Sequence, residues 1–131
     1  MQTKIFEIFI PMYPVAKARA RVTKKGFAYT PKKTKLAETE IKYFILQKKP
    51  ILFERELPLK AEFVFQFKKP KSAPKYRLFP TVKPDCSNFL KLAEDAMNGV
   101  CYVDDCQLVD ISVKKFYSDC EGIYIKLSPL F

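Results

Sequence analysis

The sequence predicts an α+β domain in which a small mixed β-sheet is covered by two main helices. Four short segments alternate apolar and polar residues with the period of a strand, and two longer segments carry apolar residues at helical spacing. The elements follow in the order strand, helix, strand, helix, strand, strand, which is typical of α+β proteins. Because the chain has 131 residues, we expect 1–131 to fold as a single domain.

The clearest strand is 59–67, in which every second residue is apolar. Another is 4–10, which ends at Pro11. The segment 108–116 alternates again, and the turn residues "DCEG" lead from it to 123–128. We therefore expect the last two strands to form a hairpin. The apolar residues that should share one face in these two strands are Val109, Ile111 and Val113, followed by Ile123, Ile125 and Leu127, the last three buried.

The two helices have recognisable ends. Thr30 and Pro31 resemble an N-cap followed by proline at the first helical position, so we expect a helix at about 31–48. Asp85 should cap a second helix of about 86–98, which Asn98 and Gly99 end.

Two segments are rich in cations. The segment 15–35 resembles a basic arm or hairpin, with Gly26 at its turn, and 68–84 resembles a proline-rich basic loop of irregular backbone. We expect the following cations to bind nucleic acid: Lys17, Arg19, Arg21, Lys24, Lys25, Lys32, Lys33, Lys69, Lys71, Lys75 and Arg77.

Charge is divided unevenly along the chain. Residues 1–83 hold 20 Lys and Arg against 6 Glu, and 84–131 hold 4 Lys against 8 Asp and Glu, which together give the net charge of +10. This division favours a polyanion-binding surface around a small acidic site. Chance clustering of solvated lysines is the alternative.

Other features exclude some classes of protein. No apolar run approaches the length of a membrane span, and the charged Glu7 interrupts the apolar start, so we expect a cytoplasmic protein without a signal peptide. The chain has no histidine, and its four cysteines form no closely spaced pair. We therefore expect reduced, mostly structural thiols rather than a zinc site or disulfides.

All six aspartates fall between 85 and 119. Asp85 lies at the start of the predicted second helix, Lys91 and Asp95 share a stripe with Ser87, and the pair Asp104 and Asp105 lies in the following loop. If that loop folds back to the helix start, Asp85 meets Asp104 or Asp105 beside Lys91.

Clustered carboxylates without histidine favour a hard cation such as Mg²⁺ or Mn²⁺. A basic surface around such a site suits a phosphodiesterase that acts on nucleic acid. Each acid also has a simpler interpretation: Asp85 as a helix cap, the pair Asp104 and Asp105 as a turn, and Asp95 as an ion-pair partner of Lys91.

The segment "KPDCSNFLKLAEDAMNGVCYVDDCQLVDISVKK" at 83–115 resembles the RusA family of Holliday junction resolvases, often carried by prophages. The upstream "KARARVTKKGFAYTPKKTK" is similar to the basic segment of many members. The resemblance implies a small α+β homodimer that cuts four-way DNA junctions with Mg²⁺. By position it assigns catalytic roles to Asp85, Lys91 and Asp105. We expect Asp85 and Asp105 to hold the metal, with Asp104 or Asp95 assisting. The residues that support the motif match are Asn88, Asp95 and Gln107.

One position departs from the family pattern. The second aspartate of the family, two residues after the first, is Ser87 here. A neutral hydroxyl is a poor replacement for a carboxylate on Mg²⁺. Three interpretations follow: Asp104 or Asp95 compensates, the chain is an altered or engineered variant, or it binds junctions without cutting them. A plain RNA- or DNA-binding regulator, whose aspartates are only caps and turns, is a further rival.

Overall fold

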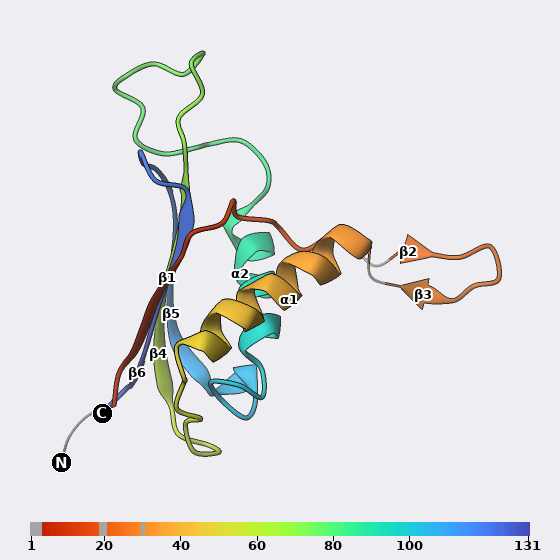
Figure 1. Ribbon diagram of the computed structural model, residues 1–131, viewed down its shortest axis with the longest axis vertical. Helices are drawn as coiled ribbons and strands as arrows, with labels where there is room; N and C mark the ends of the chain where they lie inside the picture. Colours follow the sequence, from red (N-terminus) through yellow and green to blue (C-terminus); the bar gives the residue numbers. More distant parts are fainter. Residues whose placement is uncertain (1–3, 19–20, 30) are drawn as a thin grey trace.

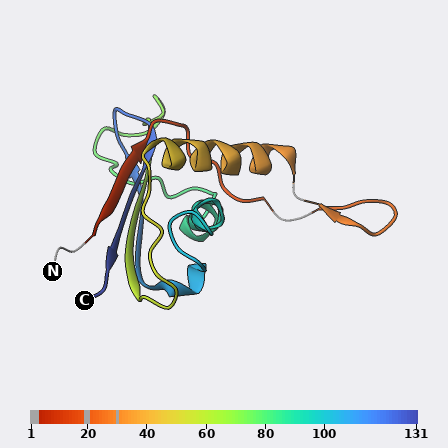
Figure 2. The same ribbon diagram turned by 60° about the horizontal axis from the view of Figure 1, so that its bottom comes forward.

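The computed structural model describes residues 4–18, 21–29 and 31–131. A four-stranded sheet carries two helices on one face, and a two-stranded hairpin extends away from this body (Figures 1 and 2). The predicted α+β architecture with one small mixed sheet and two main helices is confirmed. Of the predicted features, Arg19 and the cap Thr30 lie outside the described residues, as does the side chain of Arg21.

The sheet has the order β1-β6-β4-β5. Its strands are β1 (Phe6–Ile10), β4 (Leu59–Phe67), β5 (Leu108–Tyr117) and β6 (Gly122–Pro129). β4 pairs with β5 in parallel and with β6 antiparallel, so β4 lies between them. The predicted hairpin of the last two strands is therefore wrong, although each strand forms where its alternation predicts. β4 and β6 are the two interior strands, and the alternate residues Ala61, Phe63 and Phe65 of β4 are almost fully buried.

The helix-facing side of the sheet forms the core. Ile123, Ile125 and Leu127 of β6 are buried there, as predicted. On β5, in contrast, Val109 and Ile111 are exposed. β5 is the edge strand of the sheet, so the helices do not fully cover its apolar residues. It also carries lysines, which are common on edge strands.

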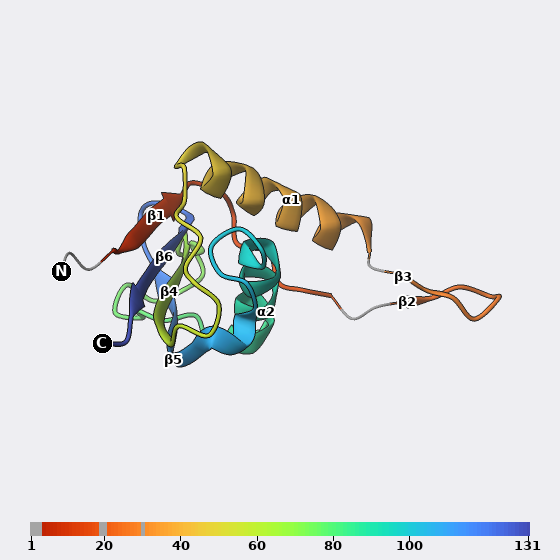
Figure 3. The ribbon, with the colours of Figure 1, turned by 90° about the horizontal axis from the view of Figure 1, so that it is seen from below.

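The helices begin and end close to the predicted boundaries. α1 (Lys32–Gln47) starts one residue later than expected, with Pro31 at the N-cap rather than at the first helical position. α2 (Cys86–Met97) has Asp85 at the predicted N-cap position, although the Asp85 side chain makes no capping hydrogen bond, and Gly99 follows with φ of 79°. Both helices pack on the same face of the sheet, with α2 lying beside α1 (Figure 3).

Chain connections place α2 at the centre of the molecule. α2 lies in the crossover that joins β4 to its parallel neighbour β5, and such crossovers place a helix on the face of the sheet. The residues before α2 form the irregular loop that the prolines predict. Its end is held to β5, because the Lys115 ammonium donates to the carbonyl oxygens of Val82 and Pro84 at 2.9 and 3.0 Å.

The basic arm is a hairpin, as expected, formed by β2 (Arg21–Val22) and β3 (Ala28–Tyr29). Its turn contains Gly26 at φ of 89°, a conformation that favours glycine. No helix in the described part of the chain is both long and apolar enough to cross a membrane.

Candidate active site

Helix α2 separates its residues into a buried face and a polar face. Its apolar residues pack into the core, with Leu92, Ala93, Ala96 and Met97 at most 1% exposed. The polar stripe that remains at the surface includes Lys91, Glu94 and Asp95. The helical repeat thus brings one cation and two carboxylates to the same face.

A short 3-10 turn (Asp105–Gln107) carries the next carboxylate to this stripe, and the buried side chain of Gln107 holds it in place. The Gln107 side-chain oxygen accepts hydrogen bonds from the backbone N–H groups of Val103 and Asp104, at 2.9 and 3.2 Å. Its amide nitrogen donates to the carbonyl oxygens of Glu54 and Leu57, at 2.7 and 3.1 Å. One side chain therefore ties the Asp104–Asp105 turn to the loop before β4.

Asp105 lies close enough to Glu94 and to Asp104 to influence the pKa of both carboxyl groups. Partial burial and the charge of Asp105 raise the pKa of Glu94. Partial burial and the hydrogen bond with Asp104 raise the pKa of Asp105, while Lys91 opposes this rise. The same hydrogen bond lowers the pKa of the exposed Asp104. The three carboxyl groups thus form a chain in which negative charge is crowded at Glu94 and Asp105.

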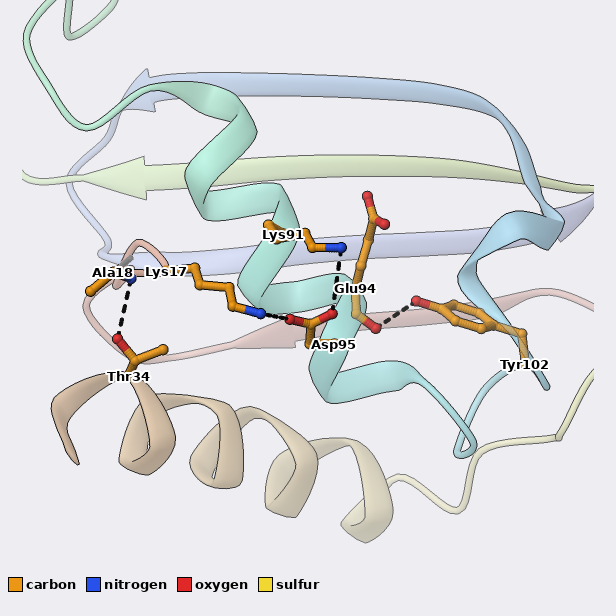
Figure 4. A network of polar contacts seen from close by, with 7 residues as sticks. All are labelled: Lys17, Ala18, Thr34, Lys91, Glu94, Asp95 and Tyr102. Atoms are coloured by element: carbon orange, nitrogen blue, oxygen red, sulfur yellow. Dashed lines mark hydrogen bonds and ion pairs between the residues drawn. The ribbon is translucent and has the colours of Figure 1, made fainter. Parts of the chain in front are cut away.

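Asp95 lies between two lysines (Figure 4). One oxygen accepts a hydrogen bond from Lys17, and the other lies 3.9 Å from the ammonium of Lys91. The backbone N–H of Lys17 also donates to the carbonyl oxygen of Asn88, at 2.9 Å. The segment that leads to the basic hairpin is therefore attached to the helix that carries the acidic stripe.

Asp85, Ser87 and Asn88 lie at the other end of α2, exposed to solvent. At 1.5 Å per residue, Asp85 is about 14 Å from Glu94 along the helix axis. Within 4–18, 21–29 and 31–131, no three Asp, Glu, Cys or His side chains are gathered to hold a metal ion. Asp85 therefore does not join Asp104 and Asp105 in one ligand group, and the turn meets the second half of the helix instead of its start.

The donor chemistry still suits a hard cation, because Mg²⁺ is commonly held by one or two carboxylates together with substrate phosphates. The neighbouring carboxyl groups of Glu94 and Asp105 provide two such ligands, with the charge of Lys91 acting on both. Sequence reasoning missed Glu94. Its position three residues after Lys91 places it on the same face, and that spacing was the available signal.

The predicted DNA-binding cations occupy three regions. Lys24 and Lys25 lie at the tip of the hairpin, and Lys32 and Lys33 are exposed at the start of α1. In the loop before α2, Lys71, Lys75 and Arg77 are exposed. Lys69 in the same loop donates to the carbonyl oxygens of Pro74 and Lys75, which gives it a structural role.

The four cysteines are free, as expected. Only Cys101 is buried, and burial raises the pKa of its thiol to about 12. Cys106 and Cys120 are exposed, so these two thiols do not have the buried, structural positions that we expected for most of the cysteines.

A basic α+β domain with a lysine and several carboxylates on one helix face has the features of a nuclease. The chain belongs to the RusA family: the family model described as endodeoxyribonuclease RusA matches residues 11–128. This family is one of endodeoxyribonucleases that resolve Holliday junctions and act on branched DNA.

The chain is also similar to a protein of Bacillus subtilis (strain 168) described as uncharacterized protein YqaN. The two are 50% identical over 52 residues, which is 40% of this chain and 37% of YqaN. The match thus spans well under half of that relative, whose description assigns no activity.

Proposed function

We propose that this chain is a Mg²⁺-dependent endodeoxyribonuclease that resolves Holliday junctions by paired nicks from a homodimer. The observation that carries the proposal is the proximity of Asp105 to the polar stripe of α2, in a chain that belongs to a family of endodeoxyribonucleases. Mn²⁺ would serve in place of Mg²⁺, because both ions prefer oxygen ligands.

The proposal gives each residue of the site a role. Asp105 holds the ion with Glu94 close by and Asp104 adjacent in the turn, whereas Asp85, at the opposite end of α2, does not share that ion. Lys91 stabilises the negative charge that develops on the cleaved phosphate. The bound ion would polarise the phosphate and lower the pKa of an attacking water.

Glu94 is the carboxylate that compensates for Ser87 in this proposal. It lies near Asp105, whose charge raises its pKa, whereas Asp95 is engaged with two lysines. The homodimer follows from the substrate, because a two-fold pair of subunits matches the pseudo-symmetry of a four-way junction.

Replacing Asp105 tests the catalytic role. Asp105→Asn removes a negative charge while keeping the size of the side chain, so nicking of a synthetic four-way junction should fall at least 100-fold, as expected for loss of a group that stabilises the transition state. Junction binding in a gel-shift assay should persist. The matched control is Asp110→Asn, which alters an exposed aspartate on β5. Joint loss of cleavage and binding would contradict the catalytic role.

The alternative is a junction-binding protein that no longer cuts, and Ser87 favours it. Ser87→Asp separates the two proposals, because it restores the family carboxylate at an exposed position of α2. If the wild type binds junctions without cutting them and Ser87→Asp cuts them, the chain is a binder that retains the active geometry. If the wild type already cuts, Ser87 is compensated.

A further inference from the structure

A cavity of about 530 Å³ lies at the end of α2 that carries Asp85. Its walls come from the segment after β1, the start of α1, the ends of β4 and β5, and the residues just before Asp85, including Lys83 and Pro84. Cavities of this size commonly hold a small organic ligand. The polar stripe of α2 does not line it, so the cavity is separate from the carboxylate cluster described above.

The inner wall of the cavity is aromatic. Tyr13 stands edge-on against Phe67, with ring centroids 5.7 Å apart, and Phe67 packs in turn against the buried Phe89, at 5.4 Å. Tyr13 is 60% exposed, so its ring is fixed from beneath while much of it remains open to solvent. An open aromatic ring on a packed aromatic base is suited to stacking against a flat ligand.

The edge of the cavity is cationic. Lys33, Lys68, Lys83 and Lys115 line it, and no aspartate or glutamate is among the described residues that do so. Lys115 holds the wall together through its bonds to loop carbonyls. The other three lysines are exposed. An apolar, aromatic interior with a purely cationic edge is complementary to a ligand with one flat ring and an attached anion.

We propose that this cavity binds a single unpaired nucleotide at the branch point of the DNA. The base stacks on Tyr13, and the flanking phosphates contact Lys33, Lys68 and Lys83. This inference rests on the proposed function, because a base pair that adjoins a branch point lacks continuous stacking and releases a base at lower cost than a pair inside a duplex. Pro84 is bonded to Asp85, so a nucleotide held here lies beside the start of α2 and helps to select which phosphate faces the carboxylates.

The direct test compares two four-way junctions that differ in one residue at the branch: an unpaired thymine in the first and an abasic residue in the second. Binding is measured in EDTA, so that no strand is cut. Since stacking of one base contributes about 1–3 kcal/mol, wild-type protein should bind the thymine junction about tenfold more tightly. Equal binding of the two junctions would overturn the inference, whatever any variant does.

Variants of Tyr13 test whether the preference for the thymine junction arises in this cavity. Tyr13→Ala should weaken binding of the thymine junction about tenfold and leave the abasic junction unchanged, whereas Tyr13→Phe keeps the ring and should keep the preference. The matched control is Tyr43→Ala. Tyr43 is 59% exposed and also stands edge-on against a phenylalanine, but it lies on α1 away from the cavity lining. A preference for thymine that survives Tyr13→Ala would contradict a role for this cavity.

If the proposed function is wrong, the same assays give a different pattern. In that case the wild type binds linear duplex as well as either junction and nicks neither of them with Mg²⁺. If the wild type prefers and cuts junctions but ignores the identity of the branch residue, the proposed function stands and the nucleotide cavity does not.

Discussion

Asp95 has two lysine partners, and the nearby sequence predicts only one of them. Its pairing with Lys91, four residues earlier on the helix, follows from helical spacing. Its contact with Lys17 joins residues 78 positions apart and depends on how the chain passes over α2. Lys17 was expected to contact DNA, and the structure instead shows its ammonium bound to Asp95.

Glu94 gives a prediction about pH at the residue scale. Because the folded protein raises the pKa of this carboxyl, the folded state favours its protonated form. That stabilisation is complete below the ordinary carboxyl pKa and is lost as the pH rises through the higher pKa of the folded state. Glu94→Gln stays neutral, so its melting temperature should exceed that of the wild type at pH 7 and approach it near pH 4.

Thermal unfolding at both values checks this prediction, with Glu40→Gln as the control, since Glu40 is exposed on α1. A variant that is less stable than the wild type at pH 7 would mean that the charged form of Glu94 is stabilising in the folded protein.

At the scale of elements, the sequence predicts where strands and helices form better than it predicts their neighbours. All four main strands and both helices lie within a few residues of their predicted positions, because each has its own periodicity and end signals. The pairing of β5 and β6 was wrong because it depends on which strand takes the centre. That choice depends on contacts between strands that are distant in the sequence, and local alternation does not reveal them.

The candidate site, like the fold, was predictable only in part. The residues that share α2 were predictable, whereas the docking of the Asp104–Asp105 turn on the second half of α2 was not. That docking depends on Gln107, whose partners at Glu54 and Leu57 are more than 45 residues away. A motif match marks Gln107 as important and does not reveal that its role is to hold a loop.

Gln107→Ala tests this role. The substitution removes the hydrogen bonds that hold partly buried backbone groups of two loops. Because an unsatisfied buried group costs about 1–3 kcal/mol, urea denaturation should show a loss of stability of about this size. Cleavage should fall with it, because Asp105 loses its support. Gln47→Ala, at the exposed end of α1, is the control and should change neither property. Unchanged stability in Gln107→Ala would contradict the anchoring role.

At the scale of the whole molecule, the basic early part and the acidic later part of the sequence remain visible in the fold. Many of the exposed cations lie on the hairpin, at the start of α1 and in the loop before α2, while several carboxylates gather on α2 and the following turn. If the cations contact phosphates, junction affinity must depend steeply on salt, because each contact releases counterions.

The matched double variants Lys71→Ala/Arg77→Ala and Lys48→Ala/Arg55→Ala measure this dependence. All four residues are exposed, but the first pair lies in the loop before α2 and the second pair lies at the end of α1 and before β4. For the first pair, the negative slope of log affinity against log salt should become shallower by about 2, since each phosphate contact contributes about 0.9 to its magnitude. It should not change for the second pair. Equal slopes for the two variants would show that the loop does not contact DNA.

The most direct measurement is cleavage of a four-way junction by the wild-type chain, compared with a linear duplex of the same sequence, in Mg²⁺ and in EDTA. A junction-resolving homodimer predicts nicks at symmetry-related positions on two opposing strands, only in the junction and only with Mg²⁺. Equal cutting of the duplex, or junction binding with no nick in Mg²⁺ or Mn²⁺, would contradict it.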